Sequence, residues 1–113
     1  MIAYLLALVT LTAAPYQGTA TRIHKNGGGE DFGLVNAVVT TTVEPNTIDI
    51  RFYRQDGALS ESFPNLVIDD SGVIQARGDG APEFVSGYLD AELLVLAIYD
   101  GKTIYFLRMN RKN

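Results

Sequence analysis

Few side chains in this chain of 113 residues are suited to catalysis, because it contains one histidine, His24, and no cysteine. Without cysteine, the chain cannot form disulfides, zinc–thiolate sites, iron–sulfur clusters or cysteine nucleophiles. A Ser–His–Asp triad would need His24 as its base, but none of the serines lies in a G-x-S-x-G turn. A single histidine also disfavours a transition-metal site. We therefore expect no enzyme activity, no cofactor and no metal ion.

Carboxylates are more frequent, and they occur in pairs at Glu30-Asp31, at Asp69-Asp70 and at Asp90 with Glu92. Two acids that face each other across a cleft could hydrolyse a glycoside, and oxygen ligands from neighbouring loops could hold calcium. The aspartates for such a calcium site would be Asp69, Asp70, Asp79 and Asp90. The spacing of an EF-hand is absent, however, and the run Asp69-Asp70-Ser71-Gly72 has the composition of a tight turn. We interpret this pair of acids as turn residues.

Aromatic and charged side chains that alternate outward from the expected strands are candidates for recognition of a partner. Tyr53 and Tyr105 would form an outward-facing platform for a sugar or a peptide, and Arg77-Gly78-Asp79 matches the tripeptide that integrins recognise. The alternatives are a cross-strand tyrosine pair that stabilises the sheet, and a plain turn. The predicted partner-binding residues are Arg51, Tyr53, Arg77, Asp79 and Tyr105.

Charge is distributed unevenly along the chain, whose net charge is −4. This acidic balance argues against binding to nucleic acid, which usually requires a basic face. Residues 56–92 contain eight acids and one base, whereas residues 102–113 contain four bases and no acid. Such a split can favour self-association or a charged partner, although acidic loops and a solvated basic end are the simpler explanation. We expect a protein partner or a small ligand.

The first fourteen residues, Met1–Ala14, carry no charged side chain and are almost wholly apolar. A transmembrane helix needs about 20 apolar residues, so we expect no stable membrane span. The length suits the apolar region of an export signal, and Gly18 and Ala20 would then precede a mature start at Thr21. An export signal also has a basic start, which this chain lacks. The alternatives are a buried strand, a core helix, and an anchor in a membrane or an assembly.

Short strands separated by turns must position these side chains. Alternation is clearest in Thr47–Arg54, where Ile48, Ile50 and Phe52 share one face. Asp100-Gly101 is a hairpin signal, which makes the apolar run before it a strand rather than a helix. The glycine-rich residues 26–31 indicate a loop, and the glycine at position 87 is a candidate bulge. The expected strands span 18–24, 34–44, 47–54, 66–68, 73–77, 84–89, 91–99 and 103–109, with residues 58–63 leading to a proline.

These elements predict an all-β fold, an antiparallel meander of about seven to eight short strands that forms a small barrel or a sandwich. Residues 1–20 would be a signal peptide or a buried N-terminal element, and residues 21–113 a single β domain. The predicted function is that of a small, acidic, non-catalytic domain, exported to the periplasm or the extracellular space, that binds a ligand or a protein partner. The alternative is a structural subunit of a viral, filament or other assembly, in which Met1–Ala14 is retained and buried.

Overall fold

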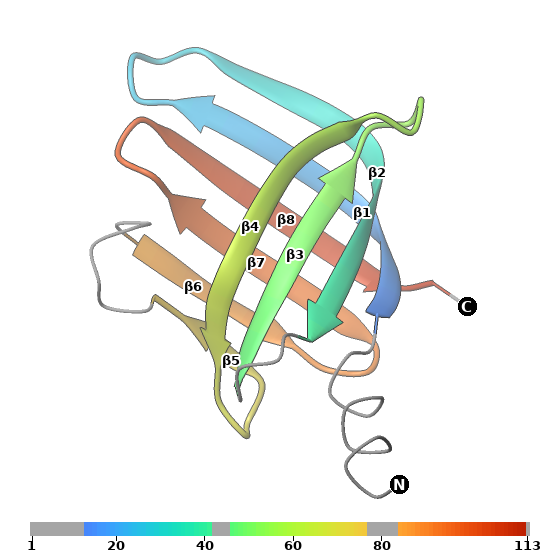
Figure 1. The fold of residues 1–113 in the computed structure, drawn as a ribbon. Helices are drawn as coiled ribbons and strands as arrows, with labels where there is room; N and C mark the ends of the chain where they lie inside the picture. The colour runs from blue at the N-terminus through green and yellow to red at the C-terminus, as the bar shows by residue number, and fades with distance from the viewer. Residues whose placement is uncertain (1–12, 42–45, 77–83, 113) are drawn as a thin grey trace, which may run out of the picture.

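The computed structural model describes residues 13–41, 46–76 and 84–112 of the chain. These residues form eight antiparallel strands, each paired with the next, and the last strand pairs with the first to close a barrel (Figure 1). The predicted all-β meander is confirmed, and it is a barrel. The strands are β1 (Ala13–His24), β2 (Gly29–Thr41), β3 (Thr47–Tyr53), β4 (Leu59–Ile68), β5 (Val73–Gln75), β6 (Phe84–Leu89), β7 (Leu93–Tyr99) and β8 (Thr103–Arg111).

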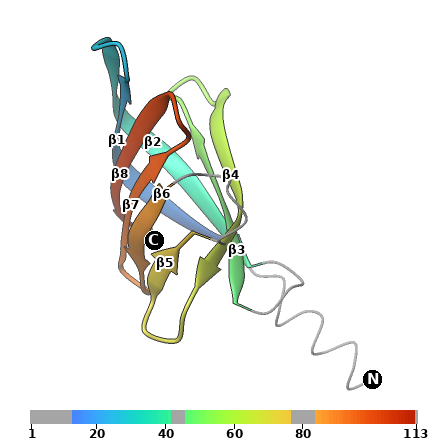
Figure 2. The same ribbon diagram turned by 90° about the vertical axis from the view of Figure 1, so that its left-hand side faces the viewer.

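The barrel is flattened into two layers that cross each other. β3 and β4 lie in front of the layer formed by β6, β7, β8 and β1 (Figure 1), and Figure 2 shows the two layers edge-on. β2 belongs to both layers, because its residues 29–40 pair with β1 and its residues 36–41 pair with β3. The register of β1 and β2 shifts beside Phe32, and the next residue, Gly33, has a φ of 66°. A bulge of this kind bends a strand, so it helps β2 to turn between the layers.

One side of every strand fills the interior. The inward positions predicted in β3, at Ile48, Ile50 and Phe52, are confirmed as buried. Burying an apolar side chain of this size stabilises a fold by about 1.5–3 kcal/mol. The buried apolar residues of all eight strands form one cluster, which contains Tyr16, Ala20, Val35, Ala37, Val39, Ile48, Ile50, Phe52, Phe63, Leu66, Ile74, Val85, Leu94, Leu96, Ile98, Tyr105, Leu107 and Met109.

Two hairpin turns form where the sequence predicts them. Gly72 closes the turn between β4 and β5 with a φ of 90°, and its N–H donates to the carbonyl of Asp69 at 3.0 Å. Gly101 has a φ of 96° in the turn between β7 and β8. Glycine adopts positive φ at little cost, so these two positions determine where the chain reverses.

Two strands start or continue where the sequence predicted loops. β2 begins at Gly29, so the glycine-rich loop is shorter than predicted. β4 runs through Pro64 as a single strand, although we predicted only residues 66–68. Pro64 and Asn65 together lie opposite Asp49, whose carboxylate accepts a hydrogen bond from the Asn65 N–H at 2.8 Å. This bulge accommodates a proline, which cannot donate to a regular ladder.

Gly87 does not form the predicted bulge, because its pairing with β5 and β7 is regular. A Cβ at this position would lie 2.5 Å from the carbonyl oxygen of Val95. Glycine is therefore required by the close approach of two strands rather than by a break in their register.

β1 closes the barrel by pairing with β2 on one side and with β8 on the other. It also contributes Tyr16 and Ala20 to the core. Gly18 lies opposite Met109, at a point where a Cβ would collide with the backbone of β8. Residues 13–20, which the sequence grouped with the N-terminal element, therefore belong to the barrel wall, whereas residues 1–12 lie outside the described part of the chain.

We predict that Gly18→Ala destabilises the barrel, because the added methyl group would collide with the carbonyl oxygen of Arg108. Overpacking of this kind costs about 1–3 kcal/mol. The matched control is Gly28→Ala, whose methyl group would come no closer than 3.6 Å to the His24 side chain. Thermal melts followed by circular dichroism compare the two variants. A Gly18→Ala protein as stable as the control would contradict the close approach of β1 and β8.

Candidate functional site

Among the described residues, the barrel wall is incomplete beside β4. β5 is only three residues long, and only Val67 and Ile68 of β4 pair with it. Among the described residues, the remainder of β4 has a strand neighbour on one side only, which is β3. A pocket of about 320 Å³ lies there, and we name it the β4 pocket. It is lined by Glu61, Ser62, Phe63, Pro64, Leu66, Ile98, Asp100 and Tyr105.

The floor of the β4 pocket is part of the hydrophobic core. Phe63, Leu66, Ile98 and Tyr105 line the pocket and are also members of the buried cluster. The rings of Phe63 and Tyr105 meet edge to face, with centroids 5.3 Å apart at an interplanar angle of 68°. The ring of Phe52 lies behind them, 6.0 Å from Phe63 and 6.3 Å from Tyr105. Such aromatic pairs add stability beyond the area they bury, so the floor is held by several contacts.

A hydrogen bond joins two walls of the β4 pocket. The hydroxyl of Tyr105 donates to Oε2 of Glu61 at 2.8 Å, although these residues belong to β8 and β4, which are not neighbours in the barrel. Residues that pair across antiparallel strands share a face. Glu61 pairs with buried Phe52, and Tyr105 pairs with buried Ile98, so both side chains point inward. The bond therefore orients a carboxylate inside the barrel.

The environment of Tyr105 keeps its phenol protonated. Burial raises the pKa of Tyr105 above its ordinary value of 10.0, and the hydrogen bond to Glu61 raises this pKa further. The nearby Arg22 acts in the opposite direction, but the pKa remains raised. Tyr105 is therefore a neutral donor to Glu61 at neutral pH.

A second carboxylate, that of Asp100, lies at the rim of the β4 pocket in the turn between β7 and β8. Its Oδ1 accepts hydrogen bonds from the backbone N–H groups of Lys102 at 2.9 Å and Thr103 at 2.8 Å. The turn therefore holds Asp100 in place. No lysine, arginine or histidine is among the described residues that line the β4 pocket. The pocket thus combines an aromatic floor with two carboxylates.

Charged side chains beside the β4 pocket form an ion pair and cation–π contacts around Phe32. Arg22 forms an ion pair with Glu30, its partner across the strands. The guanidinium carbons of Arg22 and Arg54 lie 5.3 Å and 5.6 Å from the centroid of the Phe32 ring. Cation–π contacts of this length are attractive. The two arginines therefore stack on one ring at the end of the barrel that contains the β4 pocket.

The structure separates the residues that the sequence grouped as a partner-binding surface. Arg51 is exposed and Tyr53 is half-buried, and both lie on the outer side of β3. The prediction that Tyr105 faces outward beside Tyr53 is wrong, because Tyr105 is 6% exposed and points into the barrel. Arg77 and Asp79 lie outside the described residues. Binding of a partner at Arg51 and Tyr53 stays a prediction.

The first half of β8 does not reveal which of its faces is buried. Ile104 and Phe106 alternate with Tyr105 and Leu107, so both faces are apolar there, whereas Arg108 and Asn110 in the second half lie on the same side as Phe106 and mark it as the outer face. An error of one residue in this assignment reverses every side chain of the strand. Because Tyr105 was placed outward, sequence analysis missed Glu61 as its partner, although Glu61 stands two residues before Phe63, on the same side of its strand.

His24, Asp69 and Asp90, which were also candidates for chemistry, have local partners. Nδ1 of His24, which is half-buried, lies 3.3 Å from Oγ1 of Thr103. Asp69 and Asp90 accept hydrogen bonds from backbone N–H groups of their own turns. The part of the chain that the structure describes has no group of three or more acids and histidines that could hold a metal ion. Asp79, proposed with them for calcium, is outside that part.

Comparisons of this chain with protein-family models, with curated proteins and with solved structures found no match. Within residues 13–41, 46–76 and 84–112, no helix is long and apolar enough to cross a membrane. The chemistry of the β4 pocket is therefore the basis for a functional proposal.

We predict that the barrel loses stability as the pH rises above about 10, because burial raises the pKa values of Tyr16 and Tyr105. A raised pKa means that the folded state favours the neutral phenol. The stability that this preference contributes is fully present at a pH below the pKa of the phenol in the unfolded chain. It is lost as the pH rises through the pKa of the phenol in the folded protein. When the pH is raised from about 8 to about 11, the free energy of unfolding should therefore fall by less in Tyr105→Phe than in the parent protein.

Urea unfolding of both proteins at the two pH values measures this difference. Tyr53→Phe, which removes a phenol from the outer side of β3, is the control for the loss of a tyrosine. Equal losses of unfolding free energy in the parent and in Tyr105→Phe would contradict the role assigned to the buried phenol.

Proposed function

We propose that this protein is a small binding protein that takes up an organic cation with an apolar body in the β4 pocket. The observation that carries the proposal is the presence, in one pocket, of an aromatic floor and the carboxylates of Glu61 and Asp100. Ligand sites are typically apolar clefts of about 300–1,000 Å³ with a few oriented polar groups. The volume of about 320 Å³ suits a ligand at the small end of that range.

An ammonium group on a short apolar body matches each part of the β4 pocket. Glu61 and Asp100 supply negative charge, and the rings of Phe63 and Tyr105 offer faces to which a cation is attracted. The apolar body would lie against Leu66 and Ile98, which line the pocket. Glu61 is already oriented by its bond to Tyr105, which reduces the ordering that binding requires.

We propose binding rather than catalysis because of the protonation state in the β4 pocket. Tyr105 and Glu61 lie within hydrogen-bond distance there, and Arg22 also interacts with the Tyr105 hydroxyl. A phenol whose pKa is raised above 10.0 is neutral at ordinary pH, so it is a poor base and a poor nucleophile. The pair therefore supports recognition of charge better than transfer of a proton.

Export of this protein is the second part of the proposal, and it rests on the apolar and uncharged Met1–Ala14. The barrel restricts where a signal could be removed. Cleavage before Thr21 would delete residues 13–20, and with them Tyr16 and Ala20 of the core. Cleavage no later than Ala14 would keep both residues, so we propose an upstream site.

The ligand proposal predicts that phenethylamine binds, whereas its neutral counterpart phenethyl alcohol and the anion hydrocinnamate bind at least about tenfold more weakly. Loss of one carboxylate should weaken the ammonium interaction, so Glu61→Gln should reduce the affinity for phenethylamine by about tenfold. Titrations followed by NMR chemical shifts measure the dissociation constants, and the resonances of Phe63, Leu66 and Ile98 should move.

The matched control for Glu61→Gln is Glu92→Gln, which removes an exposed carboxylate at the other end of β7. It should leave the affinity unchanged. Binding of the alcohol as tightly as the amine would show that charge does not govern the β4 pocket. Shifts confined to residues outside the pocket would refute the site itself.

The export proposal predicts that the protein purified from its native source has an N-terminus at or before Pro15. The physical reason is that Tyr16 and Ala20 are needed to close the barrel. Intact mass spectrometry determines the first residue directly. A folded protein that begins at Thr21 would overturn this prediction, and a mass that includes Met1 would overturn removal of a signal.

A further inference from the structure

The outer surfaces of the two layers differ in chemistry. Seven large hydrophobic side chains are exposed among the described residues, and six of them lie on one outer face. The seventh, Leu59, is on β4. Soluble monomers rarely leave large contiguous apolar patches exposed, so this distribution requires an explanation. The six residues are Ile23, Leu34, Val73, Phe84, Tyr88 and Phe106.

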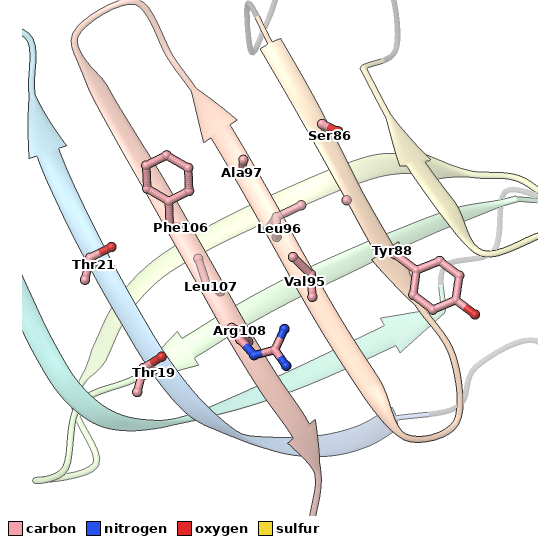
Figure 3. A pocket seen from close by; sticks show the side chains of 11 residues that line it. Thr19, Thr21, Ser86, Tyr88, Val95, Leu96, Ala97, Phe106, Leu107 and Arg108 are labelled. Atoms are coloured by element: carbon pink, nitrogen blue, oxygen red, sulfur yellow. The ribbon is translucent and has the colours of Figure 1, made fainter.

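Strand pairing arranges the outward side chains of this face in rows. One row crosses the strands from β2 to β5 and contains Leu34, Thr19, Arg108, Val95, Tyr88 and Val73. The next row contains Thr21, Phe106, Ala97 and Ser86. A hollow of about 570 Å³ lies between the two rows, and Figure 3 shows the side chains that line it. We name this surface the outer hollow.

The row through Val95 contains complementary groups on either side. Arg108 on β8 and Tyr88 on β6 are the two neighbours of Val95 across the strands. Adjacent strands are about 4.8 Å apart, so Arg108 and Tyr88 lie at similar distances from Val95. The hydroxyl of Tyr88 donates to the carboxylate of Asp90 at 3.0 Å. A cationic side chain and an anionic tyrosine–aspartate pair therefore flank one small apolar residue.

We infer that the outer hollow is the interface between two copies of this chain, related by a two-fold axis that lies in the interface above Val95 and runs along β7. Such an axis sets the position of Arg108 in one copy against the position of Tyr88 in the other. Each Arg108 then faces the Tyr88 ring and the Asp90 carboxylate of the other copy, which supplies a cation–π contact and an ion pair. Phe106 and Ala97 of the two copies pack around this contact.

A second copy fits this face better than a different protein does. A two-fold interface must be complementary to itself, because the same surface serves both partners. The outer hollow meets this requirement, since it carries Arg108 and also the Tyr88–Asp90 pair that would receive it. The inference is independent of the β4 pocket, whose lining residues differ from those of the outer hollow.

The test is the mass of the full chain in solution, measured by sedimentation equilibrium over a concentration range that reaches about 100 µM. We expect a dimer of twice the 12.3 kDa chain mass. Phe106→Ser and Arg108→Glu should each weaken association by about tenfold or more. Leu59→Ser is the matched control, because it removes the exposed hydrophobic residue that lies elsewhere. It should leave the dissociation constant unchanged.

A charge exchange tests the two-fold arrangement itself. In the double variant Arg108→Glu with Tyr88→Arg, position 108 becomes anionic and position 88 becomes cationic, so the two positions still carry opposite charges where they face each other across the interface. We expect the double variant to recover at least about half of the affinity that Arg108→Glu loses, on a logarithmic scale. If the double variant recovers none of the lost affinity, the proposed axis at Val95 is wrong.

Other outcomes overturn the interface as a whole. A wild-type chain that is monomeric at about 100 µM would overturn the interface between two copies, and a different protein would then be the partner to test at the outer hollow. Equal weakening by Leu59→Ser and Phe106→Ser, or association that no variant changes, would place the contact elsewhere on the chain. Circular dichroism of each variant confirms that its fold is intact.

Discussion

The pairing of β1 with β8 is the constraint on which the rest of the structure depends. It joins the two ends of the meander, so the sheet has no open edge at either terminal strand. It also brings Tyr16 and Met109 into one buried cluster. The hydroxyl of Tyr16 then donates to the carbonyl of Asp90 at 2.6 Å, and the guanidinium of Arg111 lies 5.8 Å from the Tyr16 ring centroid. These contacts lie where β7 begins, at the opposite end of that strand from Asp100 and the β4 pocket.

Where the described strands leave the wall incomplete beside β4, contacts through the interior hold that strand. Phe63 and Glu61 of β4 meet Tyr105 of β8 by ring packing and by a hydrogen bond. The same groups line the β4 pocket. A buried polar group that loses its partner costs about 1–3 kcal/mol, so the hydrogen bond between Glu61 and Tyr105 contributes both to the fold and to the chemistry of the site. In our proposal, the stability of the barrel and the recognition of a ligand are therefore linked at the β4 pocket.

The two outer faces of the barrel explain why some strands alternate and others do not. On β3, Asp49 and Arg51 alternate with buried residues and face solvent, as expected for a half-buried strand. On β7, and on β8 as far as Phe106, the outward residues include Val95, Ala97 and Phe106, so both faces are apolar there. A strand that is apolar on both faces is typical of one that is covered on both. The interior covers one face, and in our proposal a second copy covers the other.

Local residue types determined much of this fold. The turns at Gly72 and Gly101 and the alternation of β3 followed from positive φ and from the two-residue period of a strand, which act over a few neighbouring residues. The β4 pocket could not be predicted, because Glu61 and Tyr105 are 44 residues apart and meet only once the barrel closes. The inward direction of Tyr105 was obscured in the sequence, because Ile104 and Phe106 make the opposite face of β8 apolar as far as Arg108. The pairing of β8 with β7 sets Tyr105 opposite buried Ile98, and this tertiary contact directs the tyrosine into the core.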